Sequence, residues 1–392
     1  TWQLMKAKRA IKANWEVISE MENSEMHLKN LEDAIKTGNV EESRKDGNPD
    51  EAFKKAAKVI ERTYSSPFLA HNTMEPMNFF ANVTNTSAEL IGPTQTPEAL
   101  EGSVSKLLDM PIENITVNMT RMGGGFGRRL YVHFGVEAAA ISKKIGAPVK
   151  LIYTREDDMT QGTYRPAYQS NYKAGLDENN NLIAFSVKGS GLPEGSVFPN
   201  RFPAGTVDNY LAEKVNAKTN ITTGAWRAPR SHFTAGAEQS FLDEVAEMAG
   251  KDPIDFRLEL FDRAINNPVG EKHEYDAERY AGVLKLVKEK SNWGETEPHI
   301  YRGVAAYFCH SSYVAEVVDM VLDNGYPKIK KVWCAVDCGI VVNPDAAKNM
   351  VQGGVIDGIG HAMYSQLTFN NGAVNENNFD RYQLMRHSQA PE

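Results

Sequence analysis

The chain has 392 residues, a formal net charge of −8, 41% hydrophobic residues and 24% charged residues, which is typical of a globular protein with two or three domains. The acidic balance implies no general attraction to nucleic acid or to an anionic membrane. No apolar run reaches the roughly 18 residues of a membrane-spanning helix. Three cysteines are too few for a disulfide framework. We expect Cys334 and Cys338 to be buried thiols rather than a metal pair.

The first hundred residues predict helices separated by polar segments. Asn48 followed by Pro49 is typical of a capped helix start, and Thr96-Pro97 repeats the pattern. The expected elements are a helix, or a strand and then a helix, over residues 2–26, a polar loop over 37–50, a helix over 51–62, strands over 64–86 on both sides of residues 71–76, and a helix over 97–108.

The stretch from Asn114 to Arg155 has the most informative pattern. Apolar residues alternate with polar ones over residues 115–120, as in a half-buried strand, and recur at helical spacing over residues 132–145 before Gly146. A second strand is expected over residues 149–154. Between the first strand and the helix lie four glycines in five residues, Gly123 to Gly127. Glycines admit a ligand close to the backbone, and the positive end of the following helix favours an anion such as phosphate.

Alone, the glycine loop leaves alternatives open. The dinucleotide pattern Gly-x-Gly-x-x-Gly fits at Gly123 and Gly125 but fails at Arg128, and no nucleotide-triphosphate P-loop is present. A nicotinamide dehydrogenase needs an acidic residue about 20 positions on, where residues 143–147 read Lys-Lys-Ile-Gly-Ala. A tight turn without a ligand is the remaining alternative.

The second half of the chain predicts paired strands followed by helices. The expected strands cover residues 172–189 with a turn at 177–181, 304–306, 313–322 with a turn at 323–325, and 329–336. The expected helices cover residues 231–248, 252–262, 277–291, and a glycine-bearing stretch from Pro344 past Gly360. Residues 189–205 are expected to form a surface loop, and residues 223–230 a second small-residue loop with two arginines.

Other candidate sites are weaker. His71 and Glu75 are four residues apart, but Pro76 argues against a helix, so a packing role is favoured over a zinc pair. Cys309 and His310 are adjacent in a predicted strand and should point to opposite faces, which disfavours a catalytic dyad. The arginines nearest the two loops are candidates for binding an anion, with solvated surface positions as the alternative: Arg128, Arg129, Arg227 and Arg230.

Four separated motifs resemble one family. Arg121-Met-Gly-Gly-Gly-Phe-Gly127 resembles the cofactor loop of the xanthine dehydrogenase/aldehyde oxidase family of molybdenum hydroxylases, and Gly224-Ala-Trp-Arg-Ala-Pro229 resembles that family's arginine loop. Residues 336–344 and 352–360 resemble its C-terminal strand–loop–helix signature. The amino-acid sequences of residues 71–76 and 335–345 are most similar to those of the molybdopterin-binding large (beta) subunit of isoquinoline 1-oxidoreductase-type enzymes.

The resemblance implies an α+β fold of two elongated molybdopterin-binding domains with mixed sheets and flanking helices. The implied division is a partial N-terminal segment (1–63), a first cofactor-binding domain (64–262) and a second one (263–392). The implied cofactor is molybdenum–molybdopterin cytosine dinucleotide, with [2Fe–2S] clusters only on a small partner subunit. The implied activity is hydroxylation of a small-molecule substrate with oxygen from water; the alternative is a non-catalytic assembly or binding module. The bacterial periplasm and the cytoplasm both stay open.

The resemblance also implies site residues. Gln95 matches the family glutamine that hydrogen-bonds an oxygen on molybdenum. The cofactor-binding positions are Gly123, Gly124, Gly125, Phe126, Gly127, Arg227, Gln352, Gly353 and Gly354, and no residue of the chain is expected to ligate the metal. Leu130 stands where the purine-oxidising branch has glutamate, so an aldehyde or an aromatic N-heterocycle is the favoured substrate.

The family's general-base glutamate, in a Gly-x-Gly-Glu-Pro motif, is absent from these 392 residues. We therefore expect the chain to be an internal fragment of a longer protein that carries most of the cofactor cradle without the base. We predict that this segment, expressed alone, does not hydroxylate aldehydes or N-heterocycles, as measured by product formation. Detectable turnover by the purified segment would contradict this expectation.

Overall fold

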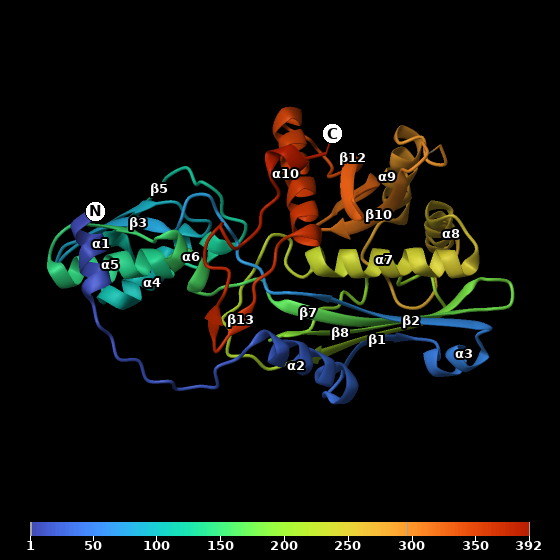
Figure 1. Cartoon of the computed structure of the whole chain (residues 1–392), viewed down its shortest axis with the longest axis horizontal. Helices are drawn as coiled ribbons and strands as arrows, with labels where there is room; N and C mark the ends of the chain where they lie inside the picture. The colour runs from blue at the N-terminus through green and yellow to red at the C-terminus, as the bar shows by residue number, and fades with distance from the viewer. Residues whose placement is uncertain (1, 296, 392) are drawn as a thin grey trace.

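Helix α7 (Ser231–Ala249) runs between two β-sheets at the centre of the larger lobe (Figure 1). The computed structural model describes residues 2–295 and 297–391. Below α7 lies a five-stranded sheet with the order β1-β9-β8-β7-β2, antiparallel except for the parallel pair β8–β9. Its strands are β1 (Glu41–Asp46), β2 (Lys58–Ser66), β7 (Ala167–Leu176), β8 (Leu182–Leu192) and β9 (Asn209–Asn216). Helices α2 (Ser24–Thr37) and α3 (Pro49–Lys55) cover the opposite face of this sheet.

Above α7 lies an antiparallel three-stranded sheet, and α7 has buried residues facing both sheets. The strands are β10 (Tyr301–Cys309), β11 (Ser312–Asp323) and β12 (Tyr326–Asp337), packed against α8 (Pro253–Asn266) and α9 (Ala277–Lys290). One hydrophobic core joins the two sheets through α7, including Phe185, Phe241, Leu242 and Tyr280. Because α7 is buried on both sides, its apolar residues surround the helix rather than forming one stripe.

A smaller lobe holds the glycine loop (Figure 1). Its four-stranded sheet has the order β5-β4-β3-β6 and its own core, which includes Phe79, Leu90 and Phe134. The strands are β3 (Asn78–Val83), β4 (Ala88–Gly92), β5 (Ile115–Met119) and β6 (Val149–Ile152), with α4 (Pro97–Leu108), α5 (His133–Ile145), α6 (Arg155–Thr160) and the 3-10 turns η1 (Ile112–Asn114) and η2 (Arg128–Leu130). Strands β5 and β6 lie at opposite edges, so the predicted strand–loop–helix–strand unit spans the whole sheet.

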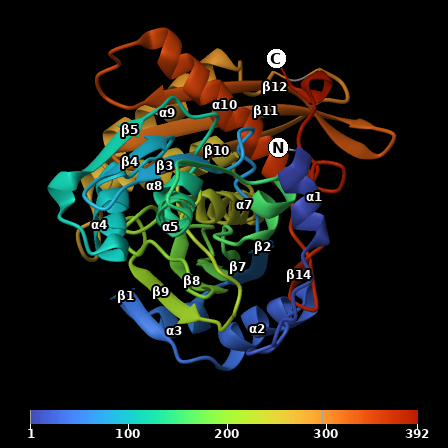
Figure 2. The ribbon, with the colours of Figure 1, turned by 90° about the vertical axis from the view of Figure 1, so that its left-hand side faces the viewer.

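The ends of the described chain lie on the outside. Helix α10 (Pro344–Met363) stands beside the three-stranded sheet and faces the smaller lobe, and β13 (Phe369–Asn370), β14 (Ala373–Val374) and η3 (His387–Gln389) follow it. Helix α1 (Trp2–Ala10) has no buried residue and touches α6 through an ion pair of 2.6 Å between Lys8 and Asp157 (Figure 2). Among the described residues, no helix is long and apolar enough to cross a membrane.

The predicted helix signals are largely confirmed. The side chains of Asn48, Asp252 and Asn343 each accept a hydrogen bond from a backbone N–H in the first turn that follows. Gly146 and Gly250 end α5 and α7 in the left-handed conformation. Thr96 stands at the predicted start of α4, although its side chain makes no cap hydrogen bond.

Four predictions about local structure are wrong. The helix expected over residues 51–62 ends at Lys55, because residues 58–66 form β2, which pairs with β7 along the whole length of β2. The polar loop over residues 37–50 contains β1, which pairs with β9. The expected surface loop over 189–205 is largely interior, with Ser196, Phe202 and Ala204 buried. Of residues 2–26, the stretch between Ala10 and Ser24 has no helix or strand.

Glu238 of α7 is buried between the two sheets. Its Oε1 accepts a hydrogen bond of 3.1 Å from Gln239. Burial raises the pKa of this carboxyl to about 8, because the hydrogen bond and the more distant Arg257 and Arg201 offset desolvation only in part. Five tyrosines lie within electrostatic range of it: Tyr172, Tyr210, Tyr275, Tyr280 and Tyr307. The core is therefore built around a protonated carboxyl group at neutral pH.

We predict that Glu238→Gln stabilises the protein at alkaline pH. The folded pKa of about 8 lies above the ordinary glutamate pKa of 4.5, so this group's contribution to stability is full below pH 4.5 and falls as pH rises towards 8. Glutamine does not ionise, so the stability difference between variant and wild type should grow across that window to a few kcal/mol, on the order of magnitude that linkage allows. Chemical denaturation at pH 5 and pH 9 measures it. The exposed Glu247→Gln on the same helix is the control, and an equal pH response of both variants would contradict the prediction.

Candidate functional site

The glycine loop and the loop before α7 meet through their backbones. The N–H of Arg227 donates to the carbonyl of Phe126 at 2.8 Å. Gly127 has φ +103°, and a Cβ at this position would lie 2.2 Å from the carbonyl oxygen of Ala225. Only glycine combines this conformation with so close an approach. The two loops, about 100 positions apart in the sequence, therefore form one joined structure.

Gln95 lies against the same loop. The side-chain Oε1 of Gln95 accepts a hydrogen bond of 3.2 Å from the N–H of Gly127. The backbone N–H of Gln95 donates to the carbonyl of Arg129 at 3.0 Å. A Cβ on Gly125 would lie 2.7 Å from the same Oε1 atom. The side-chain oxygen of Gln95 is thus fixed by the loop, and its amide NH₂ group is left as the donor for a ligand.

Three successive backbone donors of the loop face no protein acceptor. Glu75 accepts from the N–H of Gly123, and Gln95 accepts from that of Gly127. Within residues 2–295 and 297–391, the N–H groups of Gly124, Gly125 and Phe126 have no hydrogen-bond acceptor. Phe126 has φ 54°. Successive free N–H groups on a turn with left-handed residues form a concavity suited to an anionic or oxygen-rich group.

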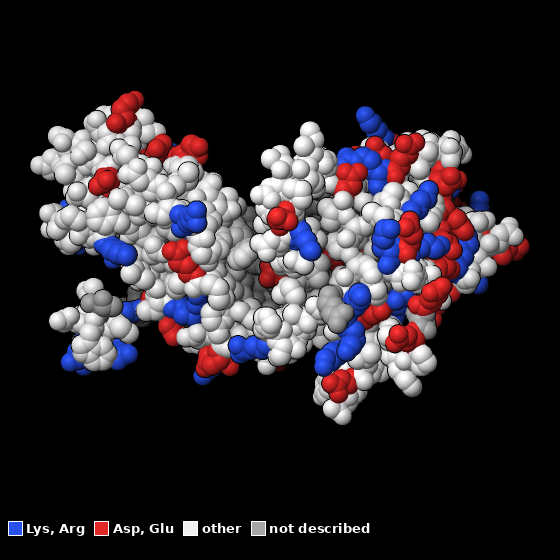
Figure 3. Space-filling view, turned by 90° about the horizontal axis from the view of Figure 1, so that it is seen from above, with Lys and Arg blue, Asp and Glu red and all other residues white. Residues whose placement is uncertain are grey.

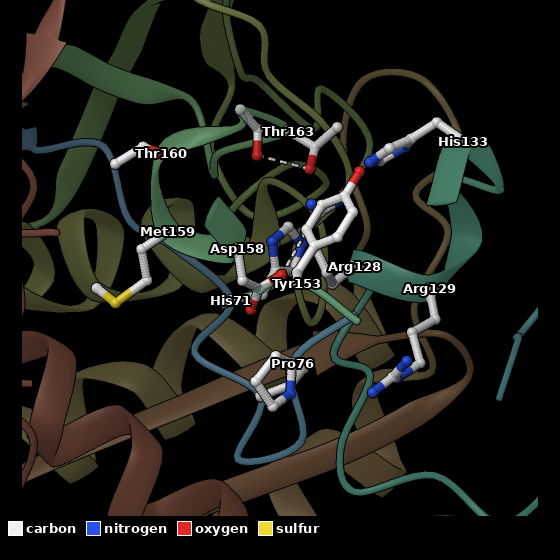
Figure 4. A network of polar contacts seen from close by, with 12 residues as sticks. His71, Pro76, Arg128, Arg129, His133, Tyr153, Asp158, Met159, Thr160 and Thr163 are labelled. Atoms are coloured by element: carbon white, nitrogen blue, oxygen red, sulfur yellow. Dashed lines mark hydrogen bonds and ion pairs between the residues drawn. The ribbon is translucent and has the colours of Figure 1, made fainter. Parts of the chain in front are cut away.

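Buried charges support the loop from behind (Figure 4). Arg129 is fully buried; it donates to the carbonyl of Gly124 at 2.8 Å and forms an ion pair of 3.0 Å with Glu75. Arg128, also buried, pairs with Asp158 at 3.5 Å and donates to Nε2 of His133 at 3.2 Å. Burial, and secondarily Arg128, lower the pKa of His133 to about 4, so its ring is neutral and accepts. Arg128 and Arg129 therefore support the loop from the interior, and the alternative of solvated surface positions is wrong for both. Each already has a carboxylate partner.

His71 fixes the second loop. Its Nε2 donates to the carbonyl of Ala225 at 2.8 Å, and burial lowers the pKa of His71 to about 4, so the ring stays neutral. The favoured packing role is in line with this contact. In the part of the chain that the structure describes, no group of three or more His, Cys, Asp or Glu side chains is arranged to hold a metal ion.

The joined loops border a cavity of about 590 Å³ between the two lobes. Helix α10 forms its other wall, and Arg227 ties the loop to this helix through an ion pair of 2.8 Å with Asp357. The lining residues are Gln95, Phe126, Gly127, Leu130, Ala225, Trp226, Arg227, Ala228, Pro229, Asn349, Met350 and Gly353. Seen from above, the surface is hollowed between the smaller lobe and the rest of the molecule, whereas charged side chains of both signs gather at the far end (Figure 3).

Most residues singled out in the sequence meet here. Gln95, Phe126, Gly127, Arg227 and Gly353 line the cavity. Gly123, Gly124 and Gly125 shape the loop beside it, and Gly354 lines a neighbouring cavity on the other side of Arg227. Gln352 is exposed and lines neither. A cavity of about 760 Å³ along β12 contains none of these residues.

One expectation about this region is corrected, and two lining residues were missed. Helix α5 contributes no residue to the cavity lining, since η2 separates its start from the glycine loop. Its N-terminus is therefore not the anion site of this cavity. Sequence reasoning also missed Asn349 and Met350; the signal is helical spacing, because residues 350, 353, 354 and 357 share one face of α10.

The cysteines also differ from expectation. Cys338 is exposed, whereas Cys334 is partly buried. Cys309 Sγ lies 2.9 Å from Nδ1 of His310. The two side chains meet because His310, at φ 49°, has already left β10 and begins the turn to β11, so the strand argument against their contact was wrong.

Comparison with protein-family models matches residues 31–261 and residues 231–391, each with a molybdopterin cofactor-binding domain. The chain belongs to the molybdopterin cofactor-binding domain family. The resemblance inferred from the motifs is confirmed, as is the α+β fold class with two such domains. The proposed division at residues 63 and 262 stays a prediction.

Similar proteins agree with this membership. The chain is 28% identical over 331 residues to the isoquinoline 1-oxidoreductase subunit beta of Brevundimonas diminuta, covering 78% of this chain and 40% of that protein. It is 28% identical over 386 residues to the membrane-bound aldehyde dehydrogenase [pyrroloquinoline-quinone] of Gluconacetobacter polyoxogenes, covering 88% and 48%. The chain thus spans less than half the length of these relatives. The structure of quinoline 2-oxidoreductase from Pseudomonas putida 86 has the same fold, with a TM-score of 0.79 at 13% identity, covering 99% of this chain and 76% of that one.

The cavity fits the cofactor of this family. A molybdopterin is anionic and rich in oxygen. Phe126, which lines the cavity, has a free backbone N–H group, and Gly124 and Gly125 in the loop beside the cavity add two more such donors. The Gln95 amide and the Arg227 guanidinium add polar groups at the same cavity.

We predict that Gly127→Ala separates the two loops. A methyl group 2.2 Å from the Ala225 carbonyl cannot be accommodated without a backbone shift. We expect the molybdenum content per chain to fall about tenfold or more and the stability to fall by about 1–3 kcal/mol. Metal analysis and chemical denaturation measure the two effects.

Gly146→Ala is the matched control, because Gly146 also has a positive φ but open space around its Cβ position. It should lose only the cost of the left-handed conformation, about 1 kcal/mol, and keep its metal. Equal metal content in the two variants would show that the contact between the loops does not shape the cofactor site.

Proposed function

We propose that the protein is the large subunit of a molybdenum hydroxylase that oxidises an aldehyde or an aromatic N-heterocycle with oxygen from water. Its electrons would pass to [2Fe–2S] clusters on a small partner subunit. The observation that carries this proposal is the single cavity shared by the glycine loop, Gln95 and the Arg227 loop. Two loops of unrelated sequence position converge on one anion-binding concavity, which a purely structural turn does not require.

The chain's own residues would bind and orient the cofactor. The loop amides hold its anionic groups, and Arg227, itself held by Asp357 at 2.8 Å, places a positive charge beside them. Gln95 donates from its NH₂ group, because its oxygen is held by Gly127. When bound, the molybdenum cofactor supplies the oxygen-transfer and electron-accepting chemistry. Gln352 is exposed, so its proposed role at the pterin requires a cofactor that reaches beyond the cavity.

The substrate class follows from the apolar wall of the cavity. Phe126, Leu130, Pro229 and Met350 line one continuous cavity. Leu130 offers no carboxylate to hydrogen-bond a purine, whereas an aldehyde chain or a planar heterocycle gains from apolar contact. Relatives named for isoquinoline and aldehyde oxidation are in line with this class.

The cytosine dinucleotide form of the cofactor and the partner subunit belong to the same proposal. A [2Fe–2S] cluster takes four protein ligands, usually cysteines. Three cysteines, of which Cys309 and Cys334 are partly buried on separate strands, provide no such set in this sequence. Electrons would therefore leave these 392 residues, and a small iron–sulfur subunit is the acceptor that we propose.

Two alternatives stay open to test. A non-catalytic binding module is favoured if the full-length protein lacks a Gly-x-Gly-Glu-Pro motif. A quinone-dependent enzyme is suggested by the name of the Gluconacetobacter relative, an aldehyde dehydrogenase described with pyrroloquinoline-quinone. The deciding experiment is analysis of the full-length protein, co-expressed with its partner, for molybdenum, pterin, cytidine nucleotide and quinone. Molybdenum and pterin near one per chain support the proposal; protein without either, or with bound quinone, overturns it.

We predict that Gln95→Leu lowers kcat about tenfold or more while most of the molybdenum stays bound. The substitution removes the side-chain donor of Gln95 and the acceptor of the Gly127 N–H, and it leaves the free amides of Gly124, Gly125 and Phe126 in place. Steady-state kinetics with metal analysis of the same samples measures both quantities. Gln161→Leu, an exposed position at the end of α6, is the control. An unchanged kcat for Gln95→Leu would remove Gln95 from the proposed machinery.

A further inference from the structure

Arg165 is the exception among the buried arginines. The other four buried guanidinium groups each pair with a carboxylate: Arg44 with Asp46 at 2.8 Å, Arg128 with Asp158 at 3.5 Å, Arg129 with Glu75 at 3.0 Å and Arg257 with Asp243 at 2.7 Å. Arg165 is 4% exposed. Across residues 2–295 and 297–391 it has no ion pair; its Nη2 donates to the carbonyl of Pro67 at 2.6 Å, and its Nε has no acceptor.

An unpaired buried cation is costly, because desolvation is not offset by an opposite charge. Burial lowers the pKa of Arg165 to about 10, with only the distant hydroxyls of Tyr382 and Tyr168 acting in the other direction. At neutral pH the group nevertheless stays charged. A guanidinium in this state is a ready partner for an anion that enters from outside the chain.

Arg165 lines a second cavity of about 570 Å³, on the far side of the Arg227 loop from the proposed cofactor site. This cavity lies between the end of β2, the first turns of α7 and the inner face of α10. Further polar groups in its lining lack partners: the indole Nε1 of Trp226, both ring nitrogens of His232, and the hydroxyl of Ser66. Trp226 is itself 4% exposed. Several unsatisfied donors thus accompany the unpaired cation.

The charges around the cavity set the charge of its ligand. Arg165 and Arg227 are positive, and Asp357 is negative. Burial lowers the pKa of His232 to about 2 and that of His361 to about 3, so both rings are neutral. The sum is one positive charge, which a single negative charge neutralises.

Much of the remaining lining is apolar, with the rings of Trp226 and Phe233 and the small residues Gly236, Ala237 and Ala362. Hydroxyl groups complete it, from Tyr64, Ser65, Ser66 and Ser240. A volume of about 570 Å³ is far more than a bare inorganic ion needs and falls in the range of small-molecule sites. We propose that this cavity binds an organic monoanion, a carboxylate carried on an apolar or aromatic body, with the carboxylate on Arg165 and the Trp226 N–H. The inference rests on this cavity and not on the molybdenum chemistry.

The test uses benzoate as the probe and benzamide, its neutral analogue, as the comparison, in calorimetric titrations of the full-length protein. Gly236 offers a blocking variant that keeps the fold. A Cβ at Gly236 meets nothing within 4 Å, and methionine suits the helix interior better than glycine. Gly236 is an exposed residue of the cavity wall, so Gly236→Met adds bulk at this wall without a clash. Gly282→Met on α9 is the matched control, since Gly282 is also an open helical glycine and lines neither cavity.

We expect saturable binding of one benzoate per chain, weaker by about tenfold or more for benzamide and for Arg165→Gln, as the loss of a charged hydrogen bond implies. Gly236→Met should weaken benzoate binding to a similar degree, and Gly282→Met should leave it unchanged. Should Arg165→Gln fail to fold, the glycine pair decides alone. Absence of saturation up to about 10 mM benzoate, or equal binding by Gly236→Met and Gly282→Met, overturns the proposal.

Discussion

The backbone contact between Gly127 and Ala225 is the constraint on which the site depends. It brings the smaller lobe within van der Waals distance of the segment that starts α7, and it leaves no room for any side chain at residue 127. His71 holds the same Ala225 carbonyl from below at 2.8 Å. One carbonyl is therefore fixed by two elements of the chain, and the position of the cavity follows from it. A site built this way is rigid, because backbone groups have no rotamers to lose.

Buried charged side chains also help to fix the position of the glycine loop. Arg128 and Arg129 are expensive to desolvate, and each is offset by a carboxylate and by hydrogen bonds to the loop or to its neighbours. Replacing Arg129 with an apolar residue would remove its desolvation cost, but the loop carbonyl of Gly124 would lose its donor. The network thus fixes the shape of a glycine-rich segment that has little shape of its own. Its carboxylates, Glu75 and Asp158, come from segments outside the loop.

Sequence signals predicted the features that depend on contacts between residues close together in the chain, such as helix starts. Asn48, Asp252 and Asn343 start helices because their side chains satisfy free N–H groups a few residues away. The glycine loop was found for a similar reason, because four glycines in five residues indicate a tight turn or a backbone that a ligand approaches closely. Residues 58–62 were misassigned to a helix because their strand conformation comes from pairing with β7, more than 100 positions later. The burial of Phe202 and Ala204 likewise depends on helices that follow them in the chain.

The site residues also divide into those that the sequence identified and those that only the folded structure reveals. Gln95 and Arg227 were identified by motif resemblance, and their convergence needed the fold. Arg165 carried no signal at all, since nothing in the sequence around it distinguishes a paired arginine from an unpaired one. The two arginines differ only in their neighbours in the folded chain. In the sequence Arg128 is the better candidate for an anion ligand, but in the structure it is already paired with a carboxylate.

The two cavities share one wall. Trp226, Arg227 and Ala228 line both, and the ion pair between Arg227 and Asp357 lies at the boundary. A ligand in either cavity therefore touches the segment that shapes the other. If an anion on Arg165 shifts the Trp226 indole, the shift is felt at the Phe126 carbonyl through the N–H of Arg227, 2.8 Å away. Because linkage is reciprocal, a cofactor that orders this segment also alters the affinity of the second cavity by the same factor.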